Sequence, residues 1–256
     1  MATKTYIIGN WKMHCSPSEA SLLVNRLKKE VKRIPDDVEV VLCPPALDLT
    51  TVRQELVHND RFALGAQNAY PVDEGAFTGE MSVRMVADLV SYIIVGHSER
   101  RHVFGERDGL IAQKMSAARR HGLKPIFCIG ETKHDRVSGH AKQVVADQLD
   151  TGLSLLTEEE VADIVIAYEP VWAIGTGENA KPEDAREMLE YIRSWLGTEY
   201  SGALAASVPL LYGGSVDGAN AASYLKLNDC AGLLVGGASV NYKSFATIID
   251  KAQAQA

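Results

Sequence analysis

Long apolar runs are absent from this 256-residue sequence, and so are paired or clustered cysteines. No stretch of roughly eighteen apolar residues occurs, which predicts that no helix spans a membrane. The first residues lack the apolar region and small-residue cleavage site of a secretory signal. The four cysteines lie far apart, at Cys15, Cys43, Cys128 and Cys230. We therefore expect reduced thiols and a cytoplasmic protein, and the lack of an HExxH motif or a His/Cys cluster predicts no metal.

An excess of positive charge is also missing. The chain has 26 Lys and Arg against 33 Asp and Glu, for a net charge of −7. This balance argues against a nucleic acid or an anionic membrane as a partner. It is compatible with a small anionic substrate, because one lysine and a few backbone N–H groups supply enough local positive potential.

Short apolar, β-branched runs recur along the chain, each followed by a segment with helical periodicity. Their nearly continuous Ile, Val and Leu content is typical of strands buried on both faces. The runs are Thr5–Gly9, Val38–Cys43, Phe62–Ala66, Tyr92–Val95, Pro125–Ile129, Ile164–Tyr168, Pro209–Tyr212 and Gly232–Val235. Among the segments between them, Arg107–His121 and Asp135–Leu156 predict helices. Since no Ser/Gly/Pro-rich linker interrupts the units, residues 1–256 predict one domain, a single (β/α)8 barrel rather than an open doubly wound sheet.

Proton-transferring residues follow several of these runs, at the strand ends where such barrels carry their active sites. Glu169 after the sixth run is either a partly desolvated base with a raised pKa or a surface carboxylate. His97 precedes a predicted helix, whose N-terminus would keep its imidazole neutral; a structural histidine is the alternative. Lys12 would offset developing negative charge or be solvated, and Asn10 would order it or merely end the strand.

Two glycine pairs and two long connections complete the pattern. Gly213-Gly214 and Gly236-Gly237 make tight turns, but together at two strand ends they favour a phosphate site. The segment from Pro170 to Ala180 has Pro and Gly at both ends of an apolar tip, which suits either a closing lid or an ordinary packed loop. The connection Gln67–Gly79 is too long for a simple turn, and its apolar side chains are poorly placed in water.

Six motifs, in this order, resemble the triosephosphate isomerase family. They read NWKM from Asn10, GAFTGE from Gly75, VGHSERR from Val95, AYEPVWAIGTG from Ala167, YGGS from Tyr212 and GGA from Gly236. The similarity extends from about Tyr6 to Phe245, which is nearly the whole chain.

The resemblance implies a cofactor-free isomerase that interconverts dihydroxyacetone phosphate and D-glyceraldehyde 3-phosphate through an enediol or enediolate. It makes Glu169 the base and neutral His97 the electrophile, with Glu99 as a further catalytic or ordering carboxylate. Lys12 and Asn10 would contact the substrate oxygens and the phosphate. The remaining substrate-binding residues that it implies are Gly175, Ser215, Gly236 and Gly237.

The resemblance also implies a homodimer, in which the Gln67–Gly79 loop inserts into a second subunit near Met13. One departure concerns the lid: the family often has Lys-Thr where this chain has Glu178 and Asn179. This departure leaves the chemical residues unchanged and predicts a different rate of lid opening.

Two alternatives are weighed against this interpretation. The first is another phosphosugar barrel, such as an aldolase or a phosphoribosyl isomerase. A Schiff-base aldolase needs a lysine at a central strand end, where the sixth run offers Glu169 instead. A non-catalytic phosphate-binding or adhesive protein on the same scaffold would not need the combination of Lys12, His97 and Glu169, since a fold alone does not fix a function.

Overall fold

Parallel strands in chain order form the centre of the molecule. The computed structural model describes residues 4–174 and 180–254. Within them, the strands close into a barrel in which β1 pairs with both β2 and β8. The strands are β1 (Thr5–Asn10), β2 (Val38–Cys43), β3 (Ala63–Ala66), β4 (Tyr92–Val95), β5 (Lys124–Ile129), β6 (Val165–Tyr168), β7 (Leu210–Tyr212) and β8 (Gly232–Val235). The predicted (β/α)8 barrel is confirmed.

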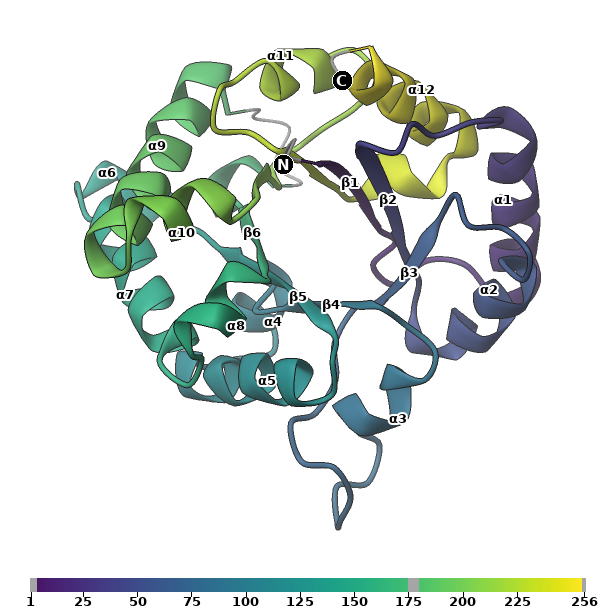
Figure 1. Cartoon of the computed structure of the whole chain (residues 1–256), viewed down its shortest axis with the longest axis horizontal. Coiled ribbons are helices and arrows are strands. Elements are labelled where there is room, and N and C mark those ends of the chain that lie inside the picture. Colours follow the sequence, from purple (N-terminus) through teal and green to yellow (C-terminus); the bar gives the residue numbers. More distant parts are fainter. Residues whose placement is uncertain (1–3, 175–179, 255–256) are drawn as a thin grey trace.

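Helices form a ring around these strands (Figure 1). They are α1 (Pro17–Glu30), α2 (Leu49–Glu55), α3 (Val83–Ala87), α4 (Ser98–His102), α5 (Asp108–Arg120), α6 (Lys133–Val137), α7 (Ala141–Leu153), α8 (Glu158–Ala162), α9 (Pro182–Glu199), α10 (Gly202–Ser207), α11 (Ala221–Leu225) and α12 (Tyr242–Gln253). In the described ranges, three short 3-10 turns lie among them: η1 (Ala46–Asp48), η2 (Val171–Ala173) and η3 (Gly237–Val240). None of the helices in the described part is long and apolar enough to cross a membrane.

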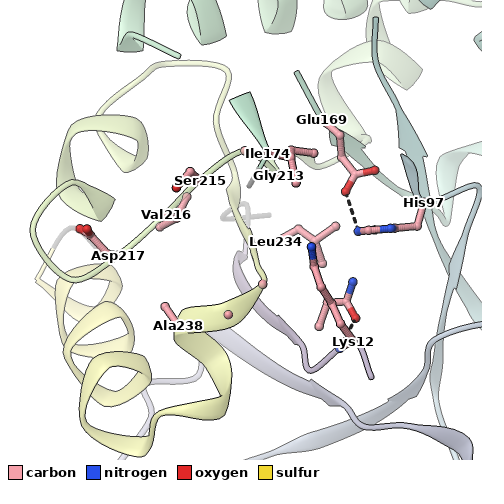
Figure 2. Close-up of a pocket in the computed structure, with 14 residues that line it drawn as sticks. Lys12, His97, Glu169, Ile174, Gly213, Ser215, Val216, Asp217, Leu234 and Ala238 are labelled. Carbon is pink, nitrogen blue, oxygen red and sulfur yellow. Dashed lines mark hydrogen bonds and ion pairs between the residues drawn. The ribbon is translucent and has the colours of Figure 1, made fainter. Parts of the chain in front are cut away.

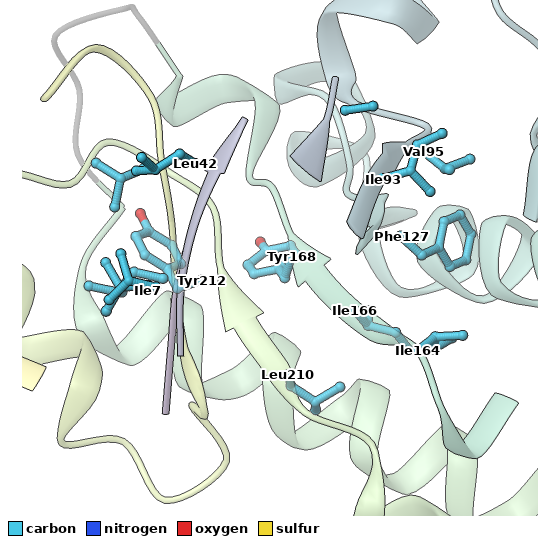
Figure 3. Close-up of a cluster of buried hydrophobic side chains, with 14 of the residues drawn as sticks. Ile7, Leu42, Ile93, Val95, Phe127, Ile164, Ile166, Tyr168, Leu210 and Tyr212 are labelled. Carbon is cyan, nitrogen blue, oxygen red and sulfur yellow. The ribbon is translucent and has the colours of Figure 1, made fainter. Parts of the chain in front are cut away.

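The apolar core has two layers separated by the strands. The larger layer contains strand residues such as Ile7 and Phe127, drawn in Figure 3, together with the inner stripes of the surrounding helices. The smaller layer contains strand residues facing the barrel interior, including Ile8, Ile94 and Leu211. Because both faces of the strands are buried, their sequences are continuously apolar rather than alternating.

One helix expected from the sequence is two helices in the structure. The stretch Asp135–Leu156 is divided into α6 and α7 by a turn at Gly139, whose φ of 78° is readily adopted only by glycine. Val137, in α6, is exposed, whereas Val145 and Leu149, in α7, are buried, so the two helices do not share one inner stripe.

The Gln67–Gly79 segment leaves the barrel after β3 and projects away from it, at the bottom of the view in Figure 1. Tyr70 forms an isolated bridge with Ser82 at its base and packs on Phe77 with ring centroids 4.5 Å apart. Val72 and Phe77 are exposed. The segment is therefore ordered around its own side chains while presenting apolar surface outward.

Candidate active site

A cavity of about 320 Å³ opens where the carboxyl ends of the strands meet. Lys12, His97 and Glu169 approach it from three different strand ends (Figure 2). The predicted site residues that line it are Asn10, Lys12, His97, Glu169, Ser215, Gly236 and Gly237. Glu99 contacts Lys12 beside the cavity, and Gly175 lies outside the described residues. The structure thus brings together every predicted site residue that it describes.

Glu169 and His97 form the buried centre of this site. His97 Nε2 lies 3.0 Å from Glu169 Oε1, and the two side chains are 7% and 2% exposed. The backbone N–H of Ser98 donates to the other carboxylate oxygen of Glu169 at 2.8 Å. The backbone N–H of Glu99 donates to His97 Nδ1 at 3.3 Å. Nδ1 is therefore an acceptor and Nε2 the donor, which is the tautomer of a neutral imidazole.

The contact between these two groups decides the direction of their pKa shifts. Burial raises the pKa of Glu169. The charge and hydrogen bond of His97 and the hydrogen bond from the Ser98 N–H lower it by a larger amount, so the net shift is downward. Burial lowers the pKa of His97, but Glu169 outweighs burial and the net shift is upward. Sequence reasoning expected the opposite directions, and for the structure described here both expectations are wrong because they ignored this direct contact.

Two glycines allow the strand ends to place these side chains. Gly96, between β4 and His97, has a φ of 75°, which turns the chain sharply into α4. A Cβ at Gly130, after β5, would lie 1.8 Å from the backbone oxygen of Glu169. Glycine at this position therefore permits the close approach of the two strand ends beside the carboxylate.

Lys12 reaches the cavity from an unusual backbone position. Its φ is 53°, in the left-handed region that non-glycine residues adopt sparingly. Asn10 Oδ1 accepts a hydrogen bond from the Lys12 N–H at 3.0 Å, so Asn10 does order this residue. Lys12 Nζ lies 2.6 Å from Glu99 Oε1, and the two side chains are 23% and 43% exposed. The ammonium group is therefore fixed at the rim of the cavity rather than freely solvated.

The glycine pairs also line the cavity: Gly213 lies beside Glu169, and Ser215 lies across the cavity from His97 (Figure 2). An ideal Cβ at Gly236 would lie 3.2 Å from Lys12 Cε, so this glycine leaves room for the lysine side chain. Glycine-rich strand ends beside an ammonium group suit a small anion. Within the described ranges, no group of three or more His, Cys, Asp or Glu side chains is arranged to hold a metal ion.

The predicted lid is described up to Ile174, which lines the cavity, and again from Ala180; Glu178 and Asn179 lie in the gap outside the described residues. Its first part is anchored by Trp172, whose Nε1 donates to Glu131 Oε1 at 2.8 Å. The hydroxyl of Tyr168 donates to the same oxygen at 3.1 Å. Burial raises the pKa of Glu131 despite these bonds.

Sequence reasoning gave no role to Glu131 or to Gln67, although both follow strand ends. Glu131 comes after β5 as Glu169 comes after β6, so its position carried the same signal. Gln67 follows β3 and contacts the backbone of Lys12, a feature that only the structure could reveal.

Comparisons with known proteins agree with this geometry. The family model described as triosephosphate isomerase matches residues 5–252. A triosephosphate isomerase of Carboxydothermus hydrogenoformans is 46% identical over 247 residues, which cover 96% of this chain and 98% of that protein. That of Roseiflexus castenholzii is 48% identical over 95% of each chain, and that of Clostridium tetani 43% identical over 96% of each. With its family model, its relatives and its barrel in agreement, the chain belongs to the triosephosphate isomerase family of enzymes.

Proposed function

We propose that this enzyme interconverts dihydroxyacetone phosphate and D-glyceraldehyde 3-phosphate by moving a proton between neighbouring carbons. The observation that supports this proposal most strongly is that Glu169, His97 and Lys12 line one cavity with glycine-rich walls. The names of the relatives support the same substrate.

Glu169 acts as the base in this proposal. Its carboxylate removes a proton from one carbon, the C–H electron pair forms a carbon–carbon double bond, and the carbonyl oxygen takes up the negative charge of an enediolate. The same carboxyl group then returns the proton to the neighbouring carbon. A substrate placed between Glu169 and His97 replaces their 3.0 Å contact, which leaves burial free to raise the basicity of the carboxylate.

His97 and Lys12 act on the oxygens of the substrate. The Nε2–H of neutral His97 polarises the carbonyl group and passes a proton to the developing oxyanion. The ammonium group of Lys12 stabilises the same charge and attracts the phosphate, since a preformed positive charge in a buried site needs no reorganisation. Glu99 and Asn10 hold Lys12 in place through its side chain and its backbone N–H.

The phosphate lies against Ser215, Gly236 and Gly237, with Gly175 of the lid as a further contact. Closure of the lid excludes water from the enediolate, which protects this intermediate from losing phosphate and strengthens the electrostatic contacts. The Trp172–Glu131 hydrogen bond anchors the lid's first turn during this movement.

The enzyme acts as a homodimer through the Gln67–Gly79 loop. The exposed Phe77 near the tip of the loop supports this proposal, and so does Met13, which is 95% exposed. A second cavity, of about 480 Å³, is lined by His14 and Cys15, directly after Met13. This cavity offers the tip of a partner's loop a place to bind. Sedimentation equilibrium tests the dimer, and a monomer at micromolar concentration contradicts it.

Three further features belong to the same proposal. The chain functions as one domain, because a single closed barrel contains every strand in the described ranges. It needs no cofactor, because the proposed steps use only carboxylate, imidazole and ammonium groups. It works in the cytoplasm, where its four free cysteines stay reduced.

The proton-transfer mechanism is tested by running the isomerisation in heavy water with a coupled assay. A proton held by Glu169 during the intermediate exchanges with solvent, so we expect deuterium on the product carbon. Product that retains only the substrate's own hydrogen would indicate a direct hydride shift and would contradict the enediolate. The same assay in the presence of a chelator tests the absence of a metal cofactor, and loss of activity contradicts that part.

A further inference from the structure

Three consecutive residues at the end of β5 contact the backbone that carries Glu169. The N–H of Glu169 donates to the backbone oxygen of Ile129 at 2.7 Å. The N–H of Val171 donates to the backbone oxygen of Glu131 at 3.1 Å. Between these two bonds, Gly130 lies so close that a Cβ there would be 1.8 Å from the backbone oxygen of Glu169. A shift of this segment therefore also shifts the backbone of Glu169.

Gln148, which is 7% exposed on α7, holds the middle residue of this segment. Its Oε1 accepts a hydrogen bond from the N–H of Gly130 at 2.8 Å, and its Nε2 donates to the backbone oxygen of the same glycine at 3.1 Å. Gly130 lies one residue beyond β5, where the parallel pairing with β6 has ended. The amide of Gln148 therefore takes the place of a neighbouring strand's backbone at this position.

The chemistry of this contact requires an amide. The two bonds need an acceptor and a donor side by side, and an amide group supplies both without a charge. A carboxylate at the same position would turn an oxygen toward the backbone oxygen of Gly130, and a methionine of similar length would supply no donor. Because Gly130 is buried, losing these bonds leaves its backbone groups without partners, which costs free energy.

Helix α7 is packed tightly on β5, so the amide is attached to a firm support. A Cβ at Gly152, one turn after Gln148, would lie 2.3 Å from the ring of Phe127 in β5. Val145 and Leu149, on the neighbouring turns of α7, are fully buried. Interiors that are packed this closely transmit displacements rather than absorb them.

We propose that Gln148 is a positioning residue, whose amide fixes Gly130 and thereby keeps Glu169 where its carboxylate meets His97 at the substrate cavity (Figure 2). This inference rests on the proposed role of Glu169 as the base. Gln148 does not line the cavity and acts only through Gly130.

The acid limb of the kcat/KM profile separates positioning from a merely structural role. In the wild type, His97 and the N–H of Ser98 hold the pKa of Glu169 below its ordinary value. We expect Gln148→Met to weaken these contacts, so that burial raises the pKa and the acid limb moves to higher pH. At neutral pH, kcat/KM should fall about 10-fold, less than the roughly 100-fold that a misplacement of about 1 Å can cost. An acid limb that stays in place overturns the inference.

Gln143→Met is the matched control. Gln143 is an exposed residue of the same helix, and its Nε2 donates to Asp147 Oδ1 at 2.8 Å. Its replacement should leave kcat/KM within about twofold of wild type and the acid limb unmoved. An equal shift of the limb in both variants would make α7 as a whole responsible, and would overturn the inference for the amide of Gln148.

A double-mutant cycle adds an independent readout. In a Glu169→Gln background, Gln148→Met should lower the residual kcat/KM by less than about threefold, because the group that Gln148 positions has already lost its function. Additive losses overturn the inference. Circular dichroism establishes that each variant is folded. If Gln148→Met does not fold, Gln148→Asn, whose amide is one carbon too short for both bonds, replaces it in the same measurements with the same criteria.

The two proposals fail in different ways. Near-normal activity in Glu169→Gln would remove the role of the base, and with it the basis of the inference. Strong impairment in Glu169→Gln together with additive losses for Gln148→Met would leave the proposed function intact and remove only the positioning role.

Discussion

A carboxylate lies at each end of strand β6, and the two are held in opposite ways. Asp163, before the strand, has a side chain that is 49% exposed and accepts from Lys124 and Arg119, each at 2.8 Å. Glu169, directly after the strand, is 2% exposed and faces His97 at 3.0 Å. The same strand therefore carries a solvated ion pair at one mouth of the barrel and a buried proton acceptor at the other.

The difference lies in the partners more than in the acids. Asp163 faces the cations Lys124 and Arg119 in partly exposed surroundings. Such ion pairs contribute little to stability, and both cations keep their protons at neutral pH. Glu169 faces an imidazole in a cavity, so a substrate can take the imidazole's place and change the basicity of the carboxylate. The first arrangement contributes little more than local structure, whereas under the proposed function the second performs the chemistry.

Replacing each acid by its amide should show the largest difference between Glu169 and Asp163, measured as the loss of kcat/KM. We expect Glu169→Gln to lose about two to four orders of magnitude in kcat/KM, the usual contribution of a general base. Asp163→Asn, the matched control at the other end of the same strand, should stay within about twofold of wild type. A coupled isomerase assay measures both, and near-normal turnover by Glu169→Gln would remove it from the role of base.

Replacing His97, the partner of Glu169, should have a smaller effect on the rate but a clear effect on its pH dependence. His97→Gln should lower kcat about 100-fold, at the low end of general acid–base contributions. Because His97 lowers the pKa of Glu169, its loss should raise that pKa and move the acid limb of the kcat/KM profile to higher pH. His102→Gln, at the exposed end of α4, serves as the control. A limb that stays in place or moves to lower pH is incompatible with the described contact.

The projecting Gln67–Gly79 loop differs from both ends of β6, because its surface is apolar and exposed rather than charged. We expect Phe77→Asp to weaken dimer association at least about tenfold, because it places a charge at an apolar contact that the proposed dimer buries. Val137→Asp changes another exposed apolar residue, on α6, and should leave association unchanged. Sedimentation equilibrium distinguishes the two; equal behaviour would show that Phe77 lies outside the interface.

The smallest expected effect is that of Asp163→Asn on the free energy of unfolding. Burial raises the pKa of Asp163, but Lys124 and Arg119 lower it below the ordinary value. Its stabilising contribution is therefore present above the unfolded-state pKa and is lost as pH falls through the lower folded-state pKa. We expect Asp163→Asn to reduce the free energy of unfolding at neutral pH by about 1 kcal/mol or less. Urea unfolding at fixed protein concentration measures this, and an equal loss at pH 3 would show that the carboxylate's charge is not responsible.

Much of the architecture was predictable because its signals are local. The apolar runs located every strand to within one residue at each end, since strands buried on both faces admit few polar residues. The division of Asp135–Leu156 was missed because a single glycine is also tolerated inside a helix, so Gly139 alone did not mark the turn that its φ of 78° makes. The predicted site residues lie close together because parallel strands bring their carboxyl ends to the same mouth, so position along the chain already implied proximity.

The sequence by itself determined the barrel and the mouth at which the candidate residues gather, because short-range patterns and strand order encode both, and the roles proposed for the acid, the imidazole and the ammonium group came from the motifs shared with the family. Only the tertiary structure decided the directions of the pKa shifts of Glu169 and His97 and the strained backbone of Lys12. These properties depend on contacts between residues far apart in the chain: 72 positions separate His97 from Glu169, and 55 separate Lys12 from Gln67. Distances and orientations between such groups are fixed by packing, which no local pattern records.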